Sequence, residues 1–153
     1  MIVSAIAGPV IAQQDPHAQM MQRGAMAMGS DQDKTTHRFL LYEDGGAIDI
    51  SANDQNDTKN RDGIRAHLPT IAKMFGDGKF DIPMLVHNSH AVPGTHVLAE
   101  KRAAVKYICV ETPNGGRVDI VTKEPAALAA VHDFLKYQIT EHKTGDSLAV
   151  RKR

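Results

Sequence analysis

The stretch Gly115-Gly116-Arg117-Val118-Asp119-Ile120 decides the fold, because the chain carries it in a second, similar form. Seventy residues earlier stands Gly45-Gly46-Ala47-Ile48-Asp49-Ile50. Each copy follows an apolar segment and precedes a run with helical spacing, at 39–42 and 58–75 for the first copy and at 107–110 and 125–142 for the second. A repeat of this length predicts a repeated supersecondary unit.

The repeated unit has the pattern of two strands and a helix. Ile48 and Ile50 fall on one side of a strand and Asp49 on the other, which is typical of a half-buried strand. The helical runs each carry one apolar stripe, made of Ile64, Leu68, Ile71 and Phe75 in the first and of Leu128, Val131, Leu135 and Ile139 in the second. We therefore expect an α+β fold: a duplicated ββα unit forming a four-stranded antiparallel sheet with two helices on one face.

The rest of the chain is arranged around this unit. We expect a Met- and His-containing flexible arm at 13–34, a single ββα-ββα domain at 35–146 and a basic tail at 147–153. The middle segment 77–95 is rich in Gly and Pro, which predicts a loop with a short extended piece at 84–86.

Composition limits the function classes. Lys and Arg number 18 and so do Asp and Glu, so there is no overall field to attract nucleic acid, and we expect no nucleic-acid partner. The single cysteine, Cys109, excludes an intramolecular disulfide, and its place in a predicted strand favours a buried, inert thiol.

The N-terminus predicts export. Residues 2–11 form an apolar run of signal-peptide length, too short to span a bilayer, so we expect no integral membrane span. Small residues before Gln13 fit a cleavage site, so we expect a signal peptide at 1–12. No basic residue precedes the run, which indicates a true start further upstream. The mature protein is expected in the periplasm or outside the cell.

Two stretches concentrate metal-ligand side chains. The arm holds His17, Met20, Met21, Met26 and Met28. Thioether sulfur suits Cu(I) and imidazole suits Cu(II), although Met20, Met21 and Met28 also fit the apolar face of a short helix at 18–28. The segment 86–97 holds His87, His90 and His96, which a loop could fold toward one metal ion or leave solvated.

Histidines in the helices carry a second set of hypotheses. His67 and His132 lie beside the apolar stripes, where a histidine either binds a metal or packs through a hydrogen bond. His142 lies ten residues after His132, about 15 Å along a helix, so the two cannot share an ion. Its place near the helix C-terminus favours the cationic form.

No catalytic motif stands out. The chain has no Gly-x-Ser-x-Gly, no phosphate-binding loop and no His-Glu-x-x-His, so the sequence leans away from an enzyme without excluding one.

Several segments together resemble a family of small exported bacterial proteins of uncharacterised function. The match covers about residues 13–146 and is carried by the segments 32–37, 61–68, 83–87, 115–118, 127–136, 138–139 and 142–146. The resemblance implies export and matching histidines at His37, His67, His87, His132 and His142. It implies no activity, and it does not extend to His90 or His96.

These observations lead to one function hypothesis and two alternatives. The first is an exported, non-catalytic protein that binds a transition metal, with copper the first candidate and zinc or haem the next. The second is an envelope interaction or structural module without metal, whose partner is another envelope protein. The third is an enzyme of unrecognised type.

Overall fold

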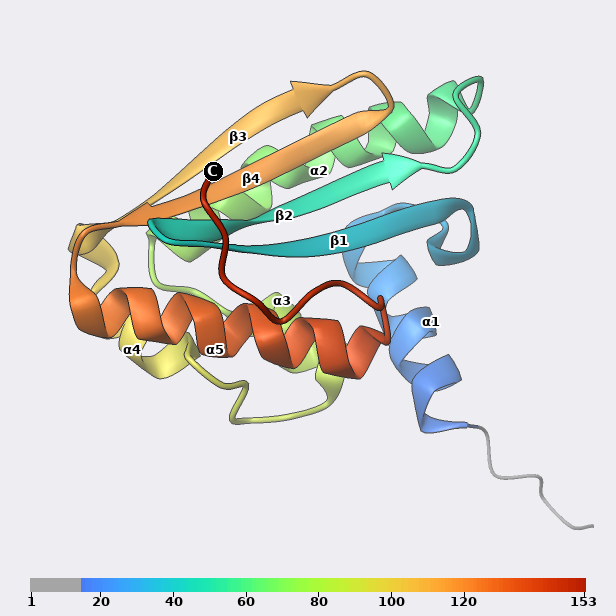
Figure 1. The fold of residues 1–153 in the computed structure, drawn as a ribbon. Helices are drawn as coiled ribbons and strands as arrows, with labels where there is room; N and C mark the ends of the chain where they lie inside the picture. Colours follow the sequence, from blue (N-terminus) through green and yellow to red (C-terminus); the bar gives the residue numbers. More distant parts are fainter. Residues whose placement is uncertain (1–14) are drawn as a thin grey trace, which may run out of the picture.

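The computed structural model describes residues 15–153, and this range contains a four-stranded antiparallel sheet and five α-helices (Figure 1). The predicted α+β class and antiparallel sheet are confirmed. The elements are α1 (Pro16–Met28), η1 (Gln32–Lys34), β1 (Thr35–Tyr42), β2 (Gly45–Ala52), α2 (Thr58–Gly76), α3 (Asp81–His87), α4 (Thr95–Glu100), η2 (Arg102–Ala104), β3 (Val105–Thr112), β4 (Gly115–Thr122) and α5 (Pro125–His142).

The sheet has the order β1-β2-β4-β3, so the second strands of the two hairpins meet at its centre. Ile48 pairs with Val118 at the middle of this contact. Gly45 and Gly115 start the two central strands, where a Cβ atom on either would collide with a backbone carbonyl of the opposite strand. The first glycine of each pair thus allows the central strands to approach closely.

The second glycine of each pair lies under a helix. A Cβ atom on Gly46 would meet the side chain of Leu135 in α5, and one on Gly116 would meet Leu68 in α2. Contacts of α2 are mainly with β3 and β4, while α5 contacts β1 and β2. Each long helix therefore seats a leucine on a glycine of a central strand.

The core fills the space between the sheet and the helices. Its most enclosed side chains are Phe134, Leu41, Ile50, Leu68, Leu98, Ile120, Leu135, Val118 and Val131. Burying a side chain of this size contributes roughly 1.5–3 kcal/mol. Both predicted helical stripes supply members of this set, which agrees with their spacing.

Acidic side chains cap the two long helices. The Asp57 carboxylate accepts from the Asn60 backbone N–H at 3.0 Å at the start of α2. At the start of α5 the Glu124 carboxylate accepts from the Ala127 N–H. The Thr122 hydroxyl is held outside the helix by the Ala104 carbonyl, to which it donates at 2.7 Å.

The predicted loop and extended piece in the segment 77–95 are wrong where α3 forms. Pro83 lies in the first turn of α3, where a missing N–H costs no helical hydrogen bond. Asn88 ends the helix in the left-handed conformation, with φ at 48°. Pro83 thus lies inside a helix here, in a segment where the Gly and Pro content predicted a loop.

Cys109 is exposed, so the predicted burial of its thiol is wrong. The physical reason is the position of β3 at the edge of the sheet, where no neighbouring strand covers its outer side. Ile108 and Val110 beside it are also exposed. Partial desolvation of the thiol and the nearby Glu111 carboxylate raise its pKa, which keeps it protonated.

Residues 16–28 of the expected arm form helix α1, which packs against α3. Met20 is buried, and Arg23 donates from Nε to the Val86 carbonyl at 2.9 Å. This bond satisfies one of the free carbonyls at the end of α3. The expected signal peptide, residues 1–12, lies outside the described residues.

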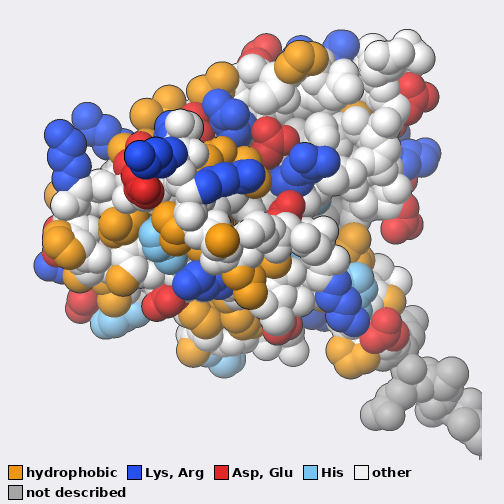
Figure 2. Space-filling view, viewed as in Figure 1, with side chains coloured by type: hydrophobic (Ala, Val, Ile, Leu, Met, Phe, Trp, Pro, Cys, Tyr) orange, Lys and Arg blue, Asp and Glu red, His pale blue; other side chains and the backbone are white. Residues whose placement is uncertain are grey.

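The basic tail crosses the front of the sheet (Figure 1). Arg151 pairs with the end of β1, since its carbonyl accepts from the Glu43 N–H and its N–H donates to the Leu41 carbonyl. Arg153 contacts the Asp119 carboxylate at 2.6 Å and lies over the Tyr42 ring. Figure 2 shows charged side chains of both signs gathered on this side. Of the helices within residues 15–153, none is long and apolar enough to cross a membrane.

Candidate functional site

His37 enters the interior from edge strand β1. It pairs with Ile50 across the β1–β2 ladder, and paired residues share a face of the sheet, so its ring lies on the side of the core. Alternation places Phe39 on that face as well. Burial lowers the pKa of His37 to about 4, so the imidazole is neutral at pH 7.

His142 is the last residue of α5, and the segment after it fixes the helix end to β1. Lys143 reverses the chain in the left-handed conformation. The Asp146 carboxylate then accepts from the backbone N–H of Phe39 at 2.9 Å and from the Thr144 hydroxyl at 2.7 Å. This clamp holds the His142 ring over Phe39, with ring centroids 5.7 Å apart.

The charge state of His142 differs from the expectation. The sequence favoured a cation stabilised by the helix C-terminus, which is wrong here. Burial, with smaller contributions from His87, His37 and His17, lowers its pKa to about 3. Desolvation therefore outweighs the helix dipole, and the ring is neutral at pH 7.

His87 comes from a third segment, the last turn of α3. Its Nε2 lies 2.9 Å from the Oε1 of Gln138 in α5. An amide oxygen only accepts, so Nε2 carries the proton and Nδ1 is left as a lone pair. This Nδ1 is buried and has no hydrogen-bond partner. Burial lowers the pKa of His87 despite the hydrogen bond to Gln138.

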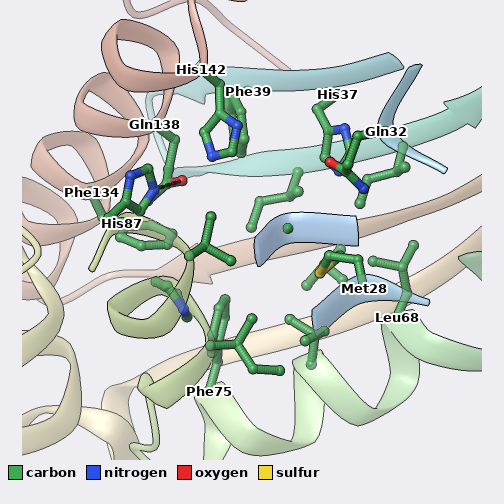
Figure 3. A pocket seen from close by; sticks show the side chains of 18 residues that line it. Met28, Gln32, His37, Phe39, Leu68, Phe75, His87, Phe134, Gln138 and His142 are labelled. Carbon is green, nitrogen blue, oxygen red and sulfur yellow. Dashed lines mark hydrogen bonds between the residues drawn. The ribbon is translucent and has the colours of Figure 1, made fainter. Parts of the chain in front are cut away.

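The three imidazoles line one interior cavity of about 70 Å³ (Figure 3). The remaining wall is largely apolar and comes from α1, α2, α3, α5 and the sheet: Gly24, Met28, Gln32, Phe39, Ile48, Ile50, Leu68, Ile71, Phe75, Ile82, Pro83, Val86, Val118, Phe134 and Gln138. No carboxylate is among the lining residues that the structure describes. The cavity is thus apolar, with imidazole nitrogen as its main basic group.

The three rings form a chain of contacts in space, with the His142 ring between those of His87 and His37. The centroids of His87 and His142 are 5.0 Å apart at nearly a right angle, and those of His142 and His37 are 6.2 Å apart and nearly parallel. Two imidazoles that share one ion through bonds of about 2 Å have ring centres roughly 5–6 Å apart. The spacing therefore suits a two-imidazole site, provided that the rings turn to aim their lone pairs at one point.

A larger ligand group is not formed. Across residues 15–153, no set of three or more His, Cys, Asp or Glu side chains is placed to hold a metal ion. Structural zinc takes four ligands, so this arrangement does not suit it. A haem is far larger than the cavity and does not fit it either.

The structure does not bring His87, His90 and His96 together, as the sequence suggested for the segment 86–97. His87 faces the cavity, whereas His90 and His96 line a separate shallow depression beside α4. The His96 side chain is 85% exposed and lies 3.2 Å from the Glu100 carboxylate. Of the three, only His87 belongs to the interior cluster.

The arm residues divide between the core and the surface. Met28 lines the cavity and Met20 is buried, while Met26 is 79% exposed. Met21 is half-buried. His17 lies at the start of α1, with a buried Nε2 that has no hydrogen-bond partner.

The two helix histidines lie outside the cavity. The His132 Nε2–H donates to the carbonyls of Tyr42 and Gly45, at 2.8 and 3.1 Å, and so ties α5 to the first hairpin. His67 is half-buried in α2, and burial lowers its pKa. The packing alternative thus accounts for His132.

Sequence reasoning missed His37, His142 and Gln138 as site residues. His37, His87 and His142 are separated by 50 and 55 positions, so no local spacing connects them. The one available signal was the resemblance, which matched all three histidines without indicating that they meet.

Comparisons with protein-family models, with curated proteins and with solved structures find nothing that matches this chain.

Proposed function

We propose that the protein is an exported, non-catalytic metal-binding protein that holds one Cu(I) ion in the interior cavity. The observation that carries this proposal is the meeting of His37, His87 and His142, all neutral, on one apolar cavity. His87 and His142 are the ligand pair, and His37 and Met28 line the same space.

The charge of the cavity favours a monovalent ion. A divalent ion in an apolar site without an anionic ligand bears a large uncompensated desolvation cost, and the wall supplies no carboxylate. Cu(I) carries one charge and accepts soft and neutral ligands, including the Met28 thioether. The ligand set therefore supports Cu(I) ahead of Cu(II) and Zn²⁺.

The test is an equilibrium competition for Cu(I) between the mature chain and a chromogenic chelator under reducing conditions. The expected result is one ion per chain, with affinity reduced by more than about tenfold, or 1.4 kcal/mol, in His87→Gln and in His142→Gln. His96→Gln is the matched control, since it removes an exposed histidine outside the cavity.

Two results of this titration would contradict the proposed site. If the wild-type chain holds Cu(I) no more tightly than a variant with His37, His87 and His142 all changed to Gln, the metal proposal is wrong. If Cu(I) binding is lost only in His96→Gln, the site lies at the surface and not in the cavity.

A second candidate rests on the outer edge of β3. This strand leaves one side of the sheet open, and Ile108 and Val110 are exposed on it. Such an edge suits strand addition by a partner protein. An interaction module of this kind replaces the metal proposal if Cu(I) does not bind, and Ile108→Lys should then abolish partner association without unfolding the chain.

We also propose that the domain is a duplicated ββα unit with α2 and α5 on one face of the sheet. The support is the matched seating of Leu68 on Gly116 and of Leu135 on Gly46, two glycines seventy positions apart. Circular permutants that start at β3 should fold if each unit is a complete packing module.

A further inference from the structure

A surface cleft of about 400 Å³ lies against the interior cavity. The start of α1, the end of α3 and the end of α5 form its walls, through residues that include Asp15, His17, Arg23, Asn88 and Glu141. Among the residues that the structure describes, His87 alone lines both the cleft and the cavity. Its side chain is therefore the partition between solvent and the interior.

The His87 ring is suited to face either way. It lies edge-on to Tyr137 on one side and to His142 on the other, with both centroids 5.0 Å away. One side-chain hydrogen bond, to Gln138, fixes the ring, and its Nδ1 has no partner. Breaking that one bond frees the ring to turn between the cleft and the cavity.

His17 provides a ligand on the outer side. It lines the cleft, and its Nε2 is buried without a hydrogen-bond partner. The Asp15 carboxylate, which accepts from the His17 backbone N–H at 3.2 Å, fixes it at the first turn of α1. An unpartnered imidazole nitrogen therefore lies on each side of the partition.

We propose that the cleft is the access route for Cu(I), with His17 as the capture ligand and His87 as the transfer ligand. His17 binds the ion first, His87 replaces it, and the His87 ring then turns inward to share the ion with His142. The ion is bound at every step by imidazole nitrogen lone pairs: His17 binds first, His87 displaces His17, and His142 is added as a second ligand, so no covalent bond to the protein breaks and copper stays Cu(I). This inference rests on the proposed function, since it names the route to the same site.

The test separates the rate of loading from the affinity. Cu(I) is delivered from a chromogenic chelator to the full mature chain, and the transfer is followed by stopped-flow absorbance. His17→Ala should slow loading by about tenfold, because a tethered ligand raises the local ion concentration at His87. The equilibrium affinity should change by less than about twofold, and His96→Ala should change neither quantity.

His17→Met provides a rescue. Its thioether also binds Cu(I), so this variant should load at nearly the wild-type rate, whereas His17→Gln should load as slowly as His17→Ala. A loss of packing at the start of α1 would instead slow all three variants equally. Their circular-dichroism spectra verify that α1 is retained.

Three outcomes overturn the route. If His17→Ala loads at the wild-type rate, His17 is not the capture ligand, although the metal proposal stands. If His17→Ala weakens equilibrium binding by more than about tenfold, His17 is a resident ligand and not a transfer site. If the wild-type chain does not bind Cu(I), the route and the proposed function are both wrong.

Discussion

Acidification from about pH 7.5 to about pH 5 should remove a large part of the stability of the metal-free protein. His37 and His142 are neutral in the folded state, with pKa values lowered to about 4 and about 3 by burial. In the unfolded chain both return to about 6.5. Between these values the unfolded state binds more protons, so stability is fully present above pH 6.5 and is lost as the pH falls toward the folded pKa values.

The magnitude follows from the same two pKa values. At pH 5 an unfolded histidine is almost fully protonated while the two buried rings are almost fully neutral, which favours unfolding by about 2 kcal/mol for each ring. The sum is roughly 4 kcal/mol, against a typical total of about 5–15 kcal/mol for a domain. His67 and His87, whose pKa values are also lowered, add in the same direction.

Urea unfolding followed by circular dichroism, with a chelator present, measures this loss. Carboxylates contribute mainly below about pH 5, so the histidines dominate the change over the chosen interval. His142→Gln should reduce the pH-dependent loss by about 2 kcal/mol, while His96→Gln, at an exposed position, should leave it unchanged. A free energy of unfolding that stays constant over this interval would show that the three rings are not buried, and the cavity described here would be wrong.

Three further predictions concern the rest of the chain. Gly46→Ala should destabilise the domain by at least about 1–3 kcal/mol in urea unfolding, because its methyl group collides with Leu135 and with the Leu40 carbonyl, whereas Gly145→Ala, with open space around it, isolates the backbone effect alone. Removal of residues 147–153 should increase amide exchange at Glu43, whose N–H donates to the Arg151 carbonyl, and leave the exchange of β4 unchanged. In its native cell the protein should be found in the envelope or outside the cell with an N-terminus near Gln13, and an intact cytosolic N-terminus would contradict export.

The sequence predicted those elements whose signals are local. Alternation and Gly-Gly pairs identified both hairpins, and the apolar stripes identified α2 and α5. It missed α3 because Pro83 breaks a helix at most positions but is tolerated in the first turn. It misjudged Cys109 because local composition does not reveal which strand forms the edge of a sheet.

The members of the candidate site could be identified only from the structure. His87 was identified, but with the wrong neighbours, because proximity along the chain suggested His90 and His96. The structure instead brings in His142 through the Asp146 clamp on β1. Such a clamp joins positions 107 residues apart, and no periodicity in one sequence reports that separation.

The pairing of β2 with β4 joins the two halves of the chain, so it should also join two fragments cut between them. Ile48 pairs with Val118 at the centre of the ladder between these strands. On its two sides, Gly46 pairs with Ile120 and Ile50 pairs with Gly116, so each half of the chain contributes the same kinds of residue. A cut in the segment 88–94 would yield two fragments, each holding one hairpin and one long helix, that rejoin across this ladder. His37 and His87 would lie on one fragment and His142 on the other. If the reassembled cavity binds the proposed Cu(I) ion, that ion should strengthen the association of the fragments, and the two-piece protein would report the presence of its own ligand.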